Sequence, residues 1–288
     1  MIKIIDTFKD YKSIIEENLH RSVEDKLTLW EEYYHNNYEE IEEKCKEDYE
    51  AEGYDWKEIG LTKVFNRVEE DYVYMVKAYE NIVQVLHGID ERVKRIFNVD
   101  IDINIVIYAG LGTAAGWVTE YEGKRAVLFG IDKIAELRWE TIEQLNSLVC
   151  HELCHVVHFD IRGEVIPTWA ESNKYNYGLW NIYEEGFAQY FQEILSNSTV
   201  DSRGEGWALQ CKAKEKELKE LYLEALKDEG KGANDFYGDW FKVLGLSDVG
   251  YYLGSKLIGG LHENYDVRYI ATMSTGEIEK KVLEFLNR

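Results

Sequence analysis

The chain has 288 residues, which is long enough to bury a sizeable core and corresponds to one large domain or two small ones. Its hydrophobic content of 45% and aromatic content of 14% exclude a disordered chain. The formal net charge of −22, with no basic cluster to interrupt it, argues against nucleic acid and anionic membrane surfaces as partners.

The sequence carries no sign of export or membrane insertion. The first residues, "MIKIIDTFKDYKSIIEENL", lack the long apolar run of a signal peptide, and no apolar stretch reaches the length of a membrane-spanning helix. Four cysteines in a chain of this length do not make a disulfide framework, and Cys150 and Cys154 lie one helical turn apart. We therefore expect a reduced, cytoplasmic protein.

The first third of the chain, residues 1–96, is predicted to be helical. Residues 31–58 hold twelve acidic residues against three lysines, which indicates a solvated helical face. The stretch "EGYDW" at 52–56 is expected to separate two helices. Apolar residues recur at steps of three and four, as on the buried face of a helix, at Val64, Val68, Val73, Val76, Ile82, Val83 and Leu86.

The pattern changes near residue 99, where strands are predicted. "VDIDINIVIYAG" alternates and then becomes continuously apolar with β-branched residues, which is typical of a strand that enters the core. Farther on, "EYEGKR" predicts a hairpin turn between "GWVT" and "AVLFGI". Gly110, Gly112 and Gly116 lie in this region, but the ending of a phosphate-binding loop is missing, so a flexible or bulged strand edge is expected.

Helical periodicity returns at Glu140 and continues to the end of the chain. One helix is predicted up to the loop at Pro167, a second over residues 181–195 with Asn181 as its N-cap, and further helices after residue 204. Apolar positions mark the buried face of the first helix at Ile142, Leu145, Leu148, Val149, Leu153, Val156 and Val157.

These elements predict an α+β fold. A small mixed or antiparallel sheet is expected to precede the helix around residue 151, with mostly helical N-terminal and C-terminal parts. Residues 1–98 would form a helical N-terminal region packed on residues 99–288. No internal repeat or linker separates the two parts, so we expect one compact unit.

The predicted helix carries the motif "HELCH", residues 151–155. Positions four apart on a helix lie about 40° apart on one face, so His151 and His155 can direct their imidazoles to one point. Neutral imidazoles are zinc ligands, and Glu152 beside them can take a proton from a water molecule. The sequence therefore predicts a site for one zinc ion (Zn2+).

A third histidine, His158, lies close by. It follows His151 by seven residues, which corresponds to about 10 Å along the helix axis. Two zinc–nitrogen bonds of about 2.1 Å cannot span that distance unless the helix ends and turns after Phe159. We expect His158 to support the ligands, face the substrate or act structurally.

The third ligand should come from another segment, and glutamate is the usual partner of two histidines in catalytic zinc sites. "TWAES" offers Glu171, whereas "YEEGFAQY" offers Glu184 and Glu185 on a predicted helix. Spacing alone does not choose among the three.

"HELCH" followed by "EEGFAQYF" resembles the gluzincin zinc metallopeptidases, in which a second helix donates a glutamate ligand. The motif "EGFAQY" is similar to that of aminopeptidase-N-like enzymes, where the glutamate before Gly-Phe-Ala binds zinc. This resemblance implies that Glu185 is the third ligand and that the fold is zincin-like. The chain also resembles a group of bacterial predicted zinc-dependent proteases.

The resemblance extends over residues 100–265, with two departures. Twenty-nine residues separate His155 from Glu185, more than is usual in the family, and no "GAMEN"-like amine-anchoring motif is present. The sequence therefore does not decide between endopeptidase and exopeptidase activity.

The resemblance also implies further site residues. In "GYYLGSKLIGGL" the Tyr-x-x-Gly segment places an oxyanion-stabilising tyrosine at Tyr251, with Tyr252 and His262 as alternatives. Gln189 could support a ligand histidine. The segment "TAAGW", residues 113–117, could pair as an edge strand with an extended peptide, or form a buried glycine-containing bend.

The function predicted from the sequence is a zinc metallopeptidase that acts on a peptide or protein substrate, with Glu152 as the general base. A zinc hydrolase of another amide or ester is one alternative. A non-catalytic zinc-containing peptide-binding or regulatory module is a second, although such a module has no need of Glu152. A helical protein in which the histidines occur by chance is a third. The oligomeric state is not predicted.

Overall fold

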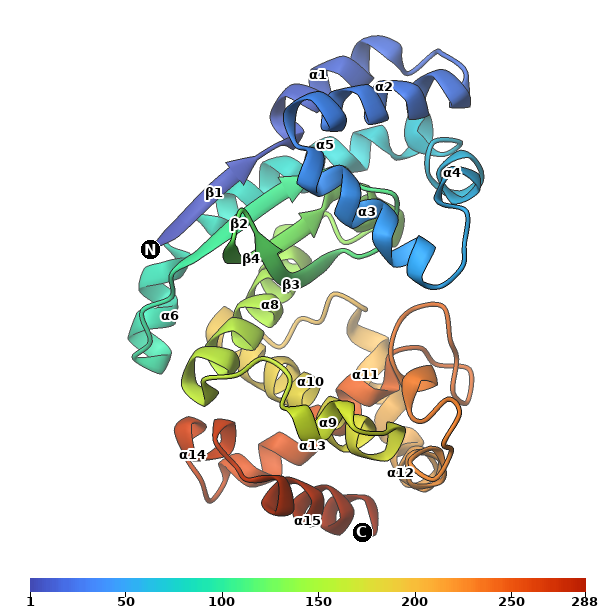
Figure 1. Ribbon diagram of the computed structural model, residues 1–288. Coiled ribbons are helices and arrows are strands. Elements are labelled where there is room, and N and C mark those ends of the chain that lie inside the picture. Colours follow the sequence, from blue (N-terminus) through green and yellow to red (C-terminus); the bar gives the residue numbers. More distant parts are fainter. The chain divides into compact units, whose positions relative to one another are not determined.

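A computed structural model describes residues 1–288, apart from the side chain of Glu205. The fold is α+β, as predicted, and combines many helices with one four-stranded sheet (Figure 1). The chain divides into two compact units, the first made of Met1–Asp90 and Asp100–Val149 and the second of Glu91–Val99 and Cys150–Arg288. This division differs from the expected boundary after residue 98, because a strand near the N-terminus pairs with the sheet that follows that boundary.

The sheet belongs to the first unit. It consists of β1 (Ile2–Asp6), β2 (Ile103–Tyr108), β3 (Gly116–Tyr121) and β4 (Lys124–Gly130). The strands lie in the order β1-β2-β4-β3, with β3 antiparallel to β4 and the other pairs parallel, so the prediction of a small mixed sheet is confirmed. The prediction of helix over residues 1–96 is wrong at β1. That strand gains its hydrogen bonds from β2, every residue of which is buried.

The hairpin between β3 and β4 turns at Glu122 and Gly123. Both residues have positive φ, 53° and 69°, as a type I′ turn requires. The predicted hairpin is thus confirmed. Strand β3 lies at the edge of the sheet, but of the segment 113–117 only Gly116 and Trp117 belong to it.

Helices lie beside this sheet within the first unit (Figure 1). The break predicted at 52–56 is confirmed. The acidic residues of 31–58 are exposed or half-buried except for the buried Glu42, which forms an ion pair with Lys46 at 2.6 Å. Aromatic groups fix the buried face, since Trp30 donates to the Ala109 carbonyl and Tyr49 to that of Leu111. The helical elements are α1 (Phe8–Asn18), α2 (Val23–Asn37), α3 (Glu39–Ala51), α4 (Trp56–Ile59), the π-helical turn η1 (Gly60–Val64), α5 (Val68–Leu86) and α7 (Ile131–Leu137). Helix α6 (Ile89–Phe97) runs from the first unit into the second.

The second unit is helical, and α8 (Ile142–Arg162) enters it at Cys150. The helix predicted for residues 181–195 begins earlier, because the side chain of Asn173 rather than Asn181 caps its first turn. The elements that follow α8 are α9 (Thr168–Glu171), α10 (Lys174–Ser196), α11 (Glu205–Ala213), α12 (Glu215–Ala225), the 3-10 turn η2 (Asn234–Phe236), α13 (Val249–His262), α14 (Val267–Ala271) and α15 (Thr275–Leu286).

Helices α10 and α13 pack backbone to backbone. A β-carbon added to Gly186 would lie 2.4 Å from the carbonyl carbon of Gly254, and one added to Gly254 would lie 2.4 Å from the carbonyl oxygen of Ile182. Only glycine permits this approach, because any side chain would have to displace backbone atoms. The contact fixes the residues near Gly186 against those near Gly254.

Within the part of the chain that the structure describes, no helix combines the length and the apolar character needed to cross a bilayer.

Candidate metal centre

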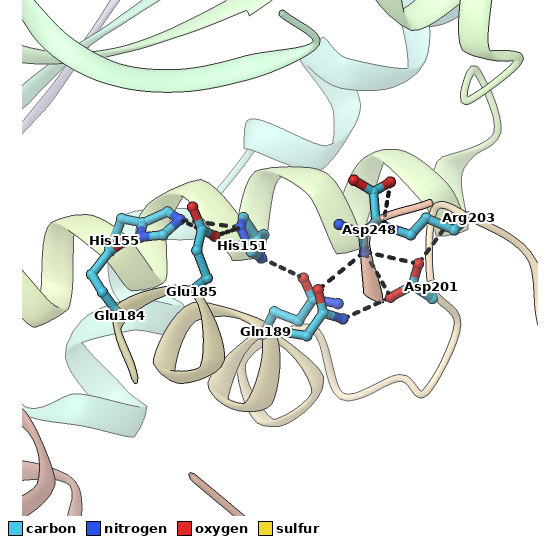
Figure 2. A network of polar contacts seen from close by, with 9 residues as sticks. His151, His155, Glu184, Glu185, Gln189, Asp201, Arg203 and Asp248 are labelled. Atoms are coloured by element: carbon cyan, nitrogen blue, oxygen red, sulfur yellow. Dashed lines mark hydrogen bonds and ion pairs between the residues drawn. The ribbon is translucent and has the colours of Figure 1, made fainter. Parts of the chain in front are cut away.

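Helices α8 and α10 bring together three side chains that can hold a metal ion. His151 and His155 lie one turn apart on α8, and their Nε2 atoms are 3.1 Å apart. The Oε2 atom of Glu185, on α10, lies 3.3 Å from the first Nε2 and 3.4 Å from the second (Figure 2). These are the residues that the motif and the resemblance predicted as ligands.

The protonation of the two imidazoles explains why these atoms fit a cation. The Nδ1 atom of His151 lies 3.2 Å from Oε1 of Gln192, and Nδ1 of His155 is hydrogen-bonded to Glu184. With Nδ1–H donating in each ring, both Nε2 atoms carry lone pairs. The buried Oε2 of Glu185 has no hydrogen-bond partner among the described residues. When both rings are in this neutral form, as metal binding requires, three electron-rich atoms face one another, an arrangement that a bound cation would stabilise.

The distances also fit zinc. Tetrahedral ligands at about 2.0–2.1 Å from an ion lie about 3.3–3.4 Å from one another. The separations between the three ligand atoms, 3.1, 3.3 and 3.4 Å, agree with this value. An ion with longer bonds to oxygen ligands, such as calcium at about 2.3–2.6 Å, would require a wider and more oxygen-rich site.

The residues that hold the histidines differ in part from the expected ones. Glu184 is the partner of His155 rather than a ligand, and Gln192 rather than Gln189 is the partner of His151. The prediction for Gln189 is wrong because this side chain donates to Asp201 at 2.7 Å. Helical spacing already favoured Gln192. At about 100° per residue, Gln192 lies about 20° from Glu185 around the helix, whereas Gln189 lies about 40° from it.

Charge and burial set the acidity of these groups. Burial alone would raise the pKa of Glu185, but the charges and hydrogen bonds of His155 and His151 together outweigh it and hold the pKa well below its ordinary value. His155 is shifted in the opposite sense, because Glu184 and Glu185 outweigh its burial and raise its pKa. Glu185 therefore stays ionised and adds negative charge to a site that would hold a cation.

Glu152 follows the first ligand on α8 and is 6% exposed. Burial raises its pKa to about 7, the neighbouring charges of Glu184 and Glu185 also raise it, and His155 lowers it. A carboxyl group that titrates near neutral pH can both accept and return a proton.

The structure separates His158 from the metal-binding residues. Its ring is fully buried, stacked on Phe187 at 4.5 Å between ring centroids and on Trp180 at 5.5 Å. Neither ring nitrogen has a hydrogen-bond partner among the described residues. The prediction that His158 is not a ligand agrees with this location, which is a structural one.

Of the three candidates for the oxyanion donor, Tyr251 alone adjoins a metal-binding residue. Its ring centroid lies 5.6 Å from that of His151. Tyr252 instead donates to Glu215 at 2.7 Å, and His262 is hydrogen-bonded to the hydroxyl of Tyr190 at 3.1 Å.

The alternative third ligand, Glu171, lies outside the candidate metal centre. It is exposed and lines a cavity of about 710 Å³ at the beginning of α10, together with Lys174 and Tyr177. It is not part of the group formed by His151, His155 and Glu185.

A polar network next to the candidate metal centre was not predicted. It joins Arg203 to Gln189, Asp201 and Asp248 (Figure 2). These residues lie on α10, in the loop after it and just before α13, so no motif spacing reveals that they meet.

In comparisons with protein-family models, curated proteins and solved structures, no match to this chain was found. The resemblance to gluzincins therefore rests on the motif residues alone.

Proposed function

We propose that this protein is a zinc-dependent peptidase. The observation that carries the proposal is the convergence of His151, His155 and Glu185 beside the buried carboxyl of Glu152. A metal site that serves structure alone needs no such carboxyl group. The similarity of "HELCH" and "EEGFAQYF" to the gluzincin motifs supports peptide bonds as the target.

The zinc ion would be held by Nε2 of the two histidines and by Oε2 of Glu185. When bound, it would supply a Lewis acid that polarises a water molecule and the substrate carbonyl. Glu184 and Gln192 would keep both imidazoles in the tautomer that directs Nε2 to the ion.

Glu152 would take a proton from the attacking water and return it to the leaving amine. Tyr251 would donate a hydrogen bond to the carbonyl oxygen as negative charge develops on it. Burial and the charge of Glu185 raise the pKa of Tyr251 well above its ordinary value, so the phenol keeps the proton that this role requires.

The test compares the wild type with Glu152→Gln for zinc content and for hydrolysis of a mixed peptide library. We expect about one zinc ion per chain in both proteins and a loss of about 100-fold or more in turnover for the variant. Glu171→Gln is the matched control and should keep full activity. Zinc without turnover of any peptide would favour a binding module, and wild-type protein that binds no zinc would overturn the proposal.

A further inference from the structure

Arg203 is held in one orientation by three polar side chains (Figure 2). Its Nε donates to Asp248 at 3.1 Å, and its Nη1 donates to Gln189 at 3.1 Å and to Asp201 at 3.2 Å. The side chain is only 13% exposed. The planar guanidinium, bonded along two of its edges, has little freedom to rotate.

This fixed guanidinium lies over two aromatic rings. Its Cζ lies 4.3 Å from the centre of the Tyr251 ring and 4.8 Å from that of Trp207. Tyr251 is further bounded by Tyr237, at 5.5 Å between ring centroids, and by His151 at 5.6 Å. The phenol is thus enclosed by a cation, a second tyrosine and a metal-binding histidine.

The network also fixes the backbone that leads to Tyr251. Asp248, which precedes α13, has a φ of 60°, in the left-handed region that costs free energy for residues other than glycine. Its bond to Arg203 holds this conformation three residues before Tyr251. Since replacing a buried ion pair by apolar groups is often neutral or stabilising, stability does not by itself explain such a network.

We propose that Arg203 is a positioning residue whose fixed guanidinium holds the phenol of Tyr251 beside the metal-binding residues, in the orientation that donates to a substrate carbonyl oxygen. This inference rests on the proposed peptidase function. Arg203 acts through Tyr251 and needs no contact with the substrate.

A double-mutant cycle tests the coupling. Removal of an oxyanion donor typically lowers kcat by about 100-fold, which we expect for Tyr251→Phe. Arg203→Lys keeps the charge but loses the planar, doubly bonded group, and should lower kcat about tenfold with KM within about twofold of the wild type. In the Tyr251→Phe background, Arg203→Lys should lower kcat by less than about twofold. Equal losses in both backgrounds would show that Arg203 acts independently and would overturn the proposal.

The matched control is Arg162→Lys. Arg162 also stacks on a ring, that of Trp180 at 5.0 Å, but does not belong to the network. Its variant should keep wild-type kcat. Zinc content and thermal unfolding of all variants show whether they fold. If Arg203→Lys does not fold, Asp248→Asn replaces it as the test. This variant keeps the guanidinium but weakens one of its bonds, and it should show the same coupling to Tyr251 with a smaller loss of kcat.

A measurement without turnover separates failure of this inference from failure of the proposed function. In zinc-loaded protein with 3-fluorotyrosine at position 251, Arg203→Lys should shift the fluorine resonance and speed the exchange between the two ring orientations. An unchanged spectrum would overturn the positioning role even in an active enzyme. If the wild type hydrolyses no peptide, the proposed function fails, and this spectrum decides whether Arg203 positions Tyr251.

Discussion

Glu184 and Glu185 are neighbours in the chain, yet they contact opposite nitrogens of one imidazole. Glu184 is hydrogen-bonded to Nδ1 of His155, and Oε2 of Glu185 lies 3.4 Å from Nε2 of the same ring. The carboxylate of Glu184 orients the ring, and that of Glu185 faces the position where Nε2 of the ring would bind a metal ion.

Substitution of Glu184 or of Glu185 by glutamine should therefore affect zinc binding to different extents. Glu185→Gln removes the charged ligand, and we expect purified protein that contains no zinc. Glu184→Gln keeps a hydrogen-bond acceptor for Nδ1 but loses the carboxylate, and should weaken zinc binding about 10–100-fold. Competition with a chromophoric chelator measures both affinities. Glu171→Gln should match the wild type, and equal effects of Glu184→Gln and Glu185→Gln would contradict these assignments.

Gln192 and Gln189 provide a second matched pair on α10. Gln192→Leu leaves Nδ1 of His151 without its acceptor, so we expect zinc affinity to fall about tenfold. Gln189→Leu disturbs the bonds to Asp201 and Arg203 but no metal-binding residue, and its zinc affinity should stay within about twofold of the wild type. The same chelator competition decides between them, and the reverse order of effects would refute the assignment.

The contact between Gly186 and Gly254 predicts a steric effect on stability. Alanine at either position must push α10 and α13 apart, and we expect the free energy of unfolding to fall by about 1–3 kcal/mol or more. Gly260→Ala, on the same helix α13 with open space around it, should instead raise it by up to about 1 kcal/mol. Urea unfolding of the three variants provides the comparison. Stability unchanged in Gly186→Ala would mean that the helices do not approach so closely.

The buried ring of His158 predicts a pH dependence of stability. Burial, and after it the charges of Arg162 and His155, lower its pKa well below the ordinary value of 6.5. Below that pH the unfolded chain binds a proton that the folded state does not, so stability falls as the pH falls. His158→Phe removes this contribution. Below about pH 6, the unfolding free energy of the wild type should fall relative to the variant by up to about 1.4 kcal/mol per pH unit.

Urea unfolding of metal-free protein at several pH values measures this difference. The two proteins share every other titrating group, so the ligand histidines cancel in the comparison. The ring of phenylalanine fits the aromatic surroundings of His158, and zinc affinity should not change. Parallel pH profiles for the two proteins would show that the imidazole is not shielded from protons.

Much of the candidate metal centre could be predicted because its information is local. The spacing of His151 and His155 follows from helical geometry, and that geometry also excluded His158. The choice of Glu185 over Glu171 came from the resemblance, since helical spacing says nothing about which distant segment packs on α8.

The errors share a physical cause, which is competition from partners that are distant in sequence. Gln189 and Gln192 both lie within about 40° of Glu185 around α10, and the bond of Gln189 to Asp201 in the following loop leaves Gln192 as the partner of His151. Strand β1 is short, and its conformation depends on pairing with β2 about a hundred residues later. The network of Arg203 involves three separate segments and leaves no periodic pattern that a sequence could display.

The metal-binding residues lie on α8 and α10, and the chain from His151 to Glu185 includes the loop around Pro167 and the short helix α9. An ion held by both helices would act as a removable cross-link that closes this loop and restricts the unfolded chain. Loss of the ion would free the loop and expose it to proteolysis. The lifetime of the protein in a cell would then depend on the local supply of that metal, before any effect on the proposed catalysis.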